Sequence, residues 1–334
     1  GGALAALAVV ALGIWSLVTA EAYRKTEAAK EPAPVSTEPR AVAPLEPTFA
    51  AYENIWEALH KKAEANVGQR GVLSALKDGD DFWAQAQQAN DNGRAGDALD
   101  FADSAFRCYL ALLMAPNNPG DMVFVKPGFL VLPGQQDIFV DGFFIDRTEV
   151  TLGQYRDFIK REEVFGPLPR DLDGWDNEYP VSDVSCLDAM AFAANAGGQL
   201  PTETQWARAA SFDRDADDWA SDTGFDDDDE PLYNFRYDSN VPVEPVGDFP
   251  GDESVFGCRD MVGNVSEWTR SSDAQKPTFG SIMMVCGGNY AEDFVPPLDF
   301  RRHMFFEMSA PQVGFRCVRE IPTSLSAVRA YLDR

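Results

Sequence analysis

Basic side chains and histidine are both scarce in this chain of 334 residues. It has 28 Lys and Arg against 54 Asp and Glu, which gives a formal net charge of −26 at pH 7. Proteins that bind nucleic acid neutralise phosphates with Lys and Arg, so this balance excludes nucleic acid as a partner. The chain has 2 histidines, His60 and His303. A metal site with three histidine ligands is therefore excluded as well.

Cysteine is also infrequent, and its odd count of 5 leaves at least one thiol unpaired within the chain. One or two disulfides would suit an oxidising compartment. The candidates for such bonds are Cys186, Cys258, Cys286 and Cys317. Buried free thiols are the alternative interpretation.

Charge is missing altogether from residues 1–20, GGALAALAVVALGIWSLVTA. About 20 apolar residues with a helical rise of ~1.5 Å just span a hydrocarbon core of ~30 Å. We therefore expect a transmembrane anchor here, with a cleaved signal peptide as the alternative. Five prolines follow within residues 21–48, and proline at this density favours an extended linker.

Residues 49–118 contain the spacing of amphipathic helices. Trp83, Ala86 and Ala89 precede Asn92-Gly93, and small or apolar residues follow it at steps of three and four. This pattern predicts a helical hairpin that resembles one tetratricopeptide-type repeat, within a small bundle that includes a helix at 49–66. Its role is either packing and spacing or the docking of a partner.

From residue 121 the pattern changes to that of strands and short helices. The runs VFVKPGFLVL and DIFVDGFFI predict a β-hairpin. Three Ser or Thr residues each have an acid or amide three positions later, which predicts capping boxes at the starts of helices. These pairs are Thr151 with Gln154, Ser185 with Asp188, and Thr202 with Gln205. A further helix is expected at the C-terminal end, within residues 321–334.

An ordered set of short blocks runs through residues 119–320: MVFVKPGF, FFIDRTEVTLGQY, PVSDVSCLDAMAF, QLPTETQW, MVGNVSEW, CGGNY and GFRC. Together they resemble the formylglycine-generating enzyme (sulfatase-modifying factor) family. The resemblance implies an α+β, C-type-lectin-like and loop-rich fold for residues 119–320. In the family the cysteine of GFRC is commonly bonded to a cysteine at the position of Ala193, so the partner of Cys317 stays open.

The resemblance also implies a chemistry that the chain lacks. Formylglycine-generating enzymes hold copper with two cysteines that follow the GGNY block, and thiolates suit Cu(I) because both are soft. The corresponding positions here are Glu292 and Pro297. Related iron-dependent sulfoxide synthases need histidines that this chain does not have. We therefore predict no copper, no iron and no catalytic activity, which would make the protein a pseudoenzyme.

Calcium is the metal that the family does imply. Its GNV-EW turn wraps a structural Ca²⁺ with backbone carbonyls and the glutamate, and hard cations prefer such oxygen ligands. The matching residues are Val262, Gly263, Val265 and Glu267. The alternative is that Glu267 only hydrogen-bonds the amides of the loop. The acidic run at 213–230 is interpreted as a solvated loop.

The segment YAEDFVPPLDFRRHMFF borders the substrate cleft of the family's enzymes. Tyr and Arg are common anchors of protein interfaces, so Tyr290, Arg301 and Arg302 are candidate partner-binding residues. The alternative is that both arginines pair with nearby acids.

We predict a membrane-anchored, inactive domain that serves as scaffold or accessory subunit of a cell-envelope membrane protein complex. Its partners would be other membrane subunits, and residues 1–20 would hold it in the bacterial inner membrane as a single-pass protein with a periplasmic soluble part. A lectin-type module for peptide or glycan is one alternative. A modifying oxidoreductase with a rebuilt active site is the other.

Overall fold

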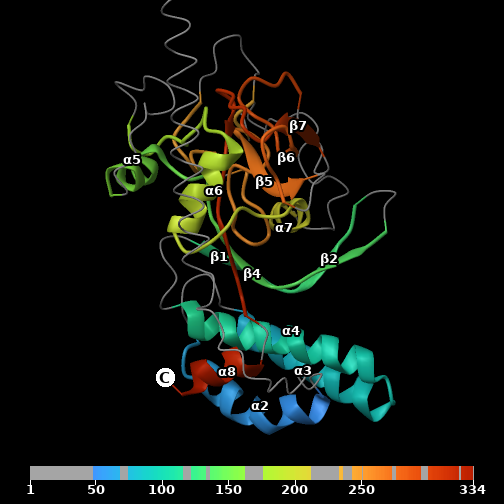
Figure 1. The fold of residues 1–334 in the computed structure, drawn as a ribbon. Helices are drawn as coiled ribbons and strands as arrows, with labels where there is room; N and C mark the ends of the chain where they lie inside the picture. Colours follow the sequence, from blue (N-terminus) through green and yellow to red (C-terminus); the bar gives the residue numbers. More distant parts are fainter. Residues whose placement is uncertain are drawn as a thin grey trace, which may run out of the picture. The chain divides into compact units, whose positions relative to one another are not determined.

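The computed structural model describes residues 48–67, 74–115, 122–132, 136–161, 176–211, 233–235, 243–249, 251–272, 276–294, 300–322 and 325–333 (Figure 1). The predicted anchor at 1–20, most of the proline-rich linker, the acidic run and Pro297 lie outside these residues. Contacts divide the chain into two compact units. One contains Ile145–Val318, and the other contains the described part of Ala33–Val131 together with Asp137–Phe144 and Arg319–Arg334. The domain boundaries given above stay predictions.

Four helices form the helical unit: α2 (Phe49–Glu64), α3 (Ala75–Asp91), α4 (Ala95–Met114) and α8 (Leu325–Leu332). Figure 1 shows them packed together. The ring of Trp83 on α3 stacks between those of Phe49 and Trp56 on α2, with ring centroids 5.4 and 5.3 Å away. Buried alanines line the facing sides of α3 and α4, and their small side chains allow the two helices to approach closely. The predicted helical hairpin is therefore present.

At two glycines of this unit a side chain would be unfavourable, for different reasons. Gly93 follows α3 with a φ of +72°, the left-handed region that ends many helices. A Cβ atom on Gly79 would lie 2.6 Å from Cε1 of Tyr109, so the α4 ring packs directly against the α3 backbone.

Three sheets contain the described strands (Figure 1). The first has the order β1 (Met122–Val125), β4 (Phe143–Asp146), β9 (Val318–Glu320). The second is the predicted hairpin, in which β2 (Gly128–Leu130) pairs antiparallel with β3 (Ile138–Val140). The third has the order β7 (Arg301–Phe305), β6 (Ile282–Cys286), β5 (Ser266–Ser272), β8 (Val313–Gly314). Strand β8 is parallel to β5, while β6 is antiparallel to both β5 and β7.

All three predicted capping boxes form at the starts of helices. Helix α5 (Leu152–Arg161) follows Thr151, which exchanges two hydrogen bonds with Gln154. Helix α6 (Cys186–Asn195) begins after Ser185, and α7 (Glu203–Ala209) begins after Thr202. Around them Tyr155, Phe192, Trp268 and Phe315 pack into one buried cluster. The mixture of helices and sheets confirms the α+β class.

Two expectations from the sequence are corrected by the structure. None of the helices within the described residues is long and apolar enough to cross a membrane, which goes against the predicted single-pass inner-membrane location. The four candidate cysteines, with Cys108, are buried free thiols, so none of the considered disulfides is formed. Burial raises the pKa of Cys258 to about 11 and that of Cys286 to about 12, which keeps both groups protonated.

Candidate functional site

The turn that carries the predicted calcium ligands is buried and tightly folded. Asp260 and Asn264 have φ values of 57° and 58°, in the left-handed region. Between them a Cβ on Gly263 would lie 2.3 Å from the carbonyl oxygen of Asn234, so only glycine fits there. The amides of the turn face a single acid, because N–H groups of Met261, Val262 and Gly263 donate to the carboxylate of Asp252.

Asp252 is thus the group that holds this turn, and sequence analysis missed it. Burial and the nearby negative charge of Asp260 raise the pKa of Asp252 to about 7, although the three amide hydrogen bonds act in the opposite direction. The acid lies outside the recognised block, at a distance of nine residues or more from its donors, and no short spacing marks it.

Glu267, the predicted side-chain ligand of calcium, is bound by an arginine and a tryptophan. Arg316 donates from Nε and Nη2 to its carboxylate at 2.8 and 2.6 Å, and both side chains are fully buried. Trp206 Nε1 donates to the same carboxylate at 2.8 Å. Burial disfavours the charged form of Arg316, but Glu267 outweighs this effect and raises the arginine pKa.

Val262, Gly263 and Val265 are buried and precede Glu267, which lies in β5. Within the described ranges, however, no group of three or more His, Cys, Asp and Glu side chains is placed to hold a metal ion. Calcium bound mainly through backbone carbonyls stays a prediction.

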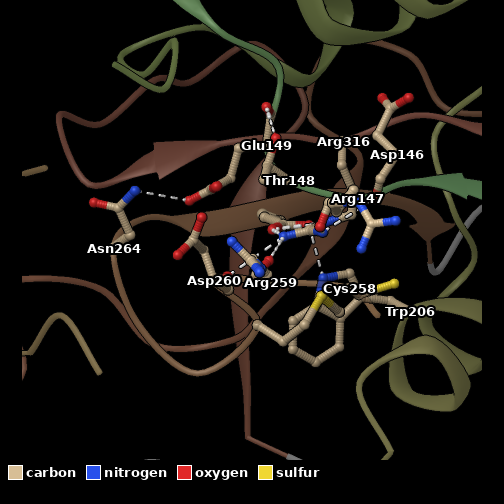
Figure 2. Close-up of polar contacts among 12 residues, drawn as sticks. Asp146, Arg147, Thr148, Glu149, Trp206, Cys258, Arg259, Asp260, Asn264 and Arg316 are labelled. Atoms are coloured by element: carbon tan, nitrogen blue, oxygen red, sulfur yellow. Dashed lines mark hydrogen bonds and ion pairs between the residues drawn. The ribbon is translucent and has the colours of Figure 1, made fainter. Parts of the chain in front are cut away.

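Two buried acids, Glu149 and Asp260, lie close to the ion pair of Glu267 and Arg316. Figure 2 shows the carboxyl groups of Glu149 and Asp260 beside one another, and Asn264 Nδ2 donates to Glu149 at 3.1 Å. Burial, and then the charge of Asp260, raise the pKa of Glu149 well above its ordinary value. Burial and the like charge of its neighbour therefore both favour the protonated form of Glu149.

The candidate partner-binding arginines both pair with acids of the same unit. Arg301 Nε donates to Glu203 at 2.8 Å, and Arg302 Nη2 donates to Glu292. Tyr290 is half-buried, and its backbone N–H donates to the carbonyl of Asn264 at 2.9 Å. The structure therefore agrees with the alternative of local ion pairs.

We define the Arg302 cluster as Ser266, Asn289, Glu292 and Arg302. Arg302 Nη1 donates to Ser266 Oγ at 2.7 Å and to the carbonyl of Gly287 at 3.3 Å. Its guanidinium carbon lies 4.7 Å from the centre of the Phe300 ring. Asn289 Nδ2 donates to Ser266 Oγ and to Glu292, each at 3.0 Å.

The donors present do not fit Cu(I). Glu292 stands at the first position where the family has a cysteine, and its hard carboxylate oxygen is already bound to a guanidinium and an amide. A positive guanidinium beside the position also repels a cation.

Strand β7 lies at the end of the four-stranded sheet and has one neighbour, β6, among the described strands. Its side chains alternate: Met304 packs on the core, while His303 and Phe305 are exposed. Phe305 exposes 47% of its surface. Among the described strands, β7 is therefore an outer strand of this sheet, and it carries exposed apolar surface at Phe305.

The fold and this site can now be set beside known proteins. Residues 112–321 match the family described as sulfatase-modifying factor enzyme 1-like domain, and the chain belongs to that family. This confirms the resemblance found in the sequence.

Three named relatives cover different shares of the chain. Hercynine oxygenase of Mycolicibacterium smegmatis is 36% identical over 107 residues, which are 30% of this chain and 24% of that protein. Formylglycine-generating enzyme of Mycobacterium tuberculosis is 28% identical over 194 residues, 46% of this chain and 62% of that protein. Inactive C-alpha-formylglycine-generating enzyme 2 of Bos taurus is 35% identical over 101 residues, 28% of this chain and 33% of that protein. The chain thus spans less than two thirds of each of these relatives.

These relatives correct the prediction of a pseudoenzyme. Hercynine oxygenases are named as enzymes, and three from different mycobacteria are 35 to 36% identical to this chain over their matched parts. That prediction rested on missing ligands for copper and iron, whereas relatives named as enzymes match part of this chain.

Proposed function

We propose that this domain recognises a polypeptide, as an accessory or scaffolding unit, by adding an extended segment of the partner to strand β7. The observation that carries the proposal is the outer position of β7 among the described strands of its sheet, with His303 and Phe305 exposed. An edge strand offers backbone N–H and C=O groups to another chain, and such pairing supplies affinity without any catalytic chemistry.

The charges on β7 do not protect this edge. Soluble proteins commonly block an edge strand with charged side chains that face solvent. Arg301 and Arg302 are instead bound by Glu203 and Glu292, so their charges are neutralised within the domain. The side chains that β7 exposes to solvent are those of His303 and Phe305.

The test compares two exposed phenylalanines in a native pull-down of the tagged full chain. We expect the wild-type protein to retain a polypeptide in stoichiometric amount and the Phe305→Asp variant to lose it. Phe129→Asp is the matched control, because Phe129 on β2 exposes 58% of its surface and lies outside this sheet. Equal retention by both variants would refute the use of β7.

Oxidative modification of a bound substrate is the second candidate, and the names of the relatives favour it. Hercynine oxygenase and formylglycine-generating enzyme share the matched region with this chain. Because Glu292 and Pro297 replace the two cysteines of the family, the reaction would need other residues as metal donors. Oxygen uptake in the presence of a cysteine-containing peptide, with Fe(II) or Cu(I) supplied separately, measures this activity directly. No uptake with either metal rejects this candidate.

The remaining expectations on ligands and partners stay part of the proposal. They are structural Ca²⁺ at Val262, Gly263, Val265 and Glu267, no copper or iron, no nucleic acid, and partner subunits associated with membranes. Isothermal titration with Ca²⁺ tests the first of these.

A further inference from the structure

Two hydrogen-bond donors converge on one carboxylate oxygen in the Arg302 cluster. Arg302 Nη2 and Asn289 Nδ2 both donate to Oε1 of Glu292. We propose that Arg302 and Asn289 form a binding site for a carboxylate of the partner polypeptide, in which Glu292 is an internal competitor. This inference rests on the proposed function, because Arg302 belongs to β7.

The donors are fixed in place by contacts that do not involve Glu292. Ser266 Oγ and the carbonyl of Gly287 hold Nη1 of Arg302, and the Phe300 ring lies against its guanidinium plane. Asn289 is held by Ser266 and by the backbone N–H of Ala291, which donates to its Oδ1 at 3.0 Å. Removal of Glu292 would therefore leave two donors that already point to the same place. Donors oriented in advance lose little freedom on binding.

The chemistry of these donors selects a carboxylate. A guanidinium presents N–H groups in a fork that matches carboxylate geometry, and charge-assisted bonds of this kind are the strong ones. A cationic group would be repelled, and a neutral amide oxygen would lack the negative charge that attracts the guanidinium. Side-chain exposures of 27% for Arg302 and 18% for Glu292 show that the pair is partly accessible.

Glu292 can leave this site without a change of fold. It lies in a short turn, since its backbone N–H donates to the carbonyl of Asn289 at 3.0 Å. Rotation of its side chain would free both donors, of which Arg302 is the more exposed, at 27% against 4% for Asn289. Glu292 occupies both donors in most molecules under this proposal. The apparent affinity for an external carboxylate is then the intrinsic affinity multiplied by the fraction of molecules in which Glu292 has left the site.

The experiment removes the competitor and measures peptide binding by isothermal titration calorimetry. The probes are a short acetylated peptide with a free C-terminal carboxylate, the same peptide amidated, and an amidated version with one internal Asp. We expect Glu292→Ala to bind at least one carboxylate peptide about tenfold more tightly than the wild type. Comparing the two carboxylate peptides tells whether the site takes a chain terminus or an acidic side chain.

Glu203→Ala is the matched control. It removes the acid bound to the neighbouring Arg301 and changes the net charge by the same amount. Arg302→Ala, added to Glu292→Ala, should abolish the gain. A gain of equal size in Glu203→Ala would show a general charge effect and overturn the proposal. So would unchanged affinity in a Glu292→Ala protein with wild-type circular dichroism, or equal binding of the amidated peptide. If Glu292→Ala misfolds, Glu292→Gln takes its place, because it keeps the shape and removes the charge.

The two proposals fail in different ways. If Phe305→Asp loses the partner and Glu292→Ala shows no gain, recognition along β7 stands and the carboxylate site is rejected. If Glu292→Ala binds carboxylate peptides while Phe305→Asp retains the partner, the carboxylate site stands and the role of β7 is rejected.

Discussion

Replacing Glu267 by Gln tests the buried ion pair with Arg316. The substitution keeps the shape of the side chain and an acceptor for Trp206 Nε1, but it removes the negative charge that faces Arg316. Both side chains are fully buried, so the guanidinium would be left in the interior without an anion. Breaking a buried pair in this way typically costs about 3–5 kcal/mol.

The matched control is the same substitution in an exposed pair. Glu253 accepts from Arg259 Nε at 2.7 Å, but 39% and 35% of the two side chains are exposed. Pairs of this kind contribute about 0–1 kcal/mol, so Glu253→Gln should have little effect. The contrast between the two variants therefore isolates burial, since the chemical change is identical.

The assay is hydrogen exchange of the β5 peptide, which contains Glu267, because a chain with two compact units need not unfold in one step. We expect Glu267→Gln to lose protection corresponding to about 3–5 kcal/mol and Glu253→Gln to lose at most about 1 kcal/mol. The difference should be the same with Ca²⁺ and with a chelator, because it arises from Arg316. Similar protection in both variants, or a difference that disappears without Ca²⁺, would refute the reasoning.

Three shorter predictions concern acid, glycine and thiol groups. In the folded protein the pKa of Asp252 is about 7, above its ordinary value of 3.8. The stability that this shift contributes is therefore complete below pH 3.8 and is lost as the pH rises through 7. Thermal midpoints of the wild type should fall over this window, and those of Asp252→Asn should fall less. Gly263→Ala should destabilise the chain by about 1–3 kcal/mol, because the new Cβ would overlap the carbonyl of Asn234. Gly96→Ala in α4 should instead stabilise the chain by up to about 1 kcal/mol, because nothing lies within 4 Å of the new Cβ. Denaturation midpoints of both variants measure these effects. All 5 thiols are buried and should resist alkylation until the protein is unfolded, and fast labelling of any one in the native state would contradict this.

Local spacing in the sequence was sufficient for several elements. The Ser185–Asp188 and Thr202–Gln205 capping boxes formed as predicted, because their hydrogen bonds join residues three positions apart and need no distant partner. The hairpin around Gly93 followed from helical periodicity and a glycine at the turn. The family was also evident from ordered blocks, and the match over residues 112–321 confirms it.

Pairing between distant residues depended on the tertiary structure alone. Glu267 and Arg316 lie 49 positions apart, and Asp252 reaches the turn amides from outside any recognisable motif. The sequence suggested that Glu267 binds calcium or amides, and it gave no means to place a guanidinium against it. Folding brings such groups together because burying a charge without a partner is costly, and packing decides which partner is within reach.

The sequence by itself determined the family, the α+β class and the absence of cysteine at both Glu292 and Pro297, because these follow from residue identity and short-range order. Only the tertiary structure decided that Glu292 binds Arg302, that all the thiols stay free, and that β7 is an outer strand among those the structure describes. The physical reason is that edge position, burial and ion-pair choice depend on which strands and side chains meet across long separations in the chain.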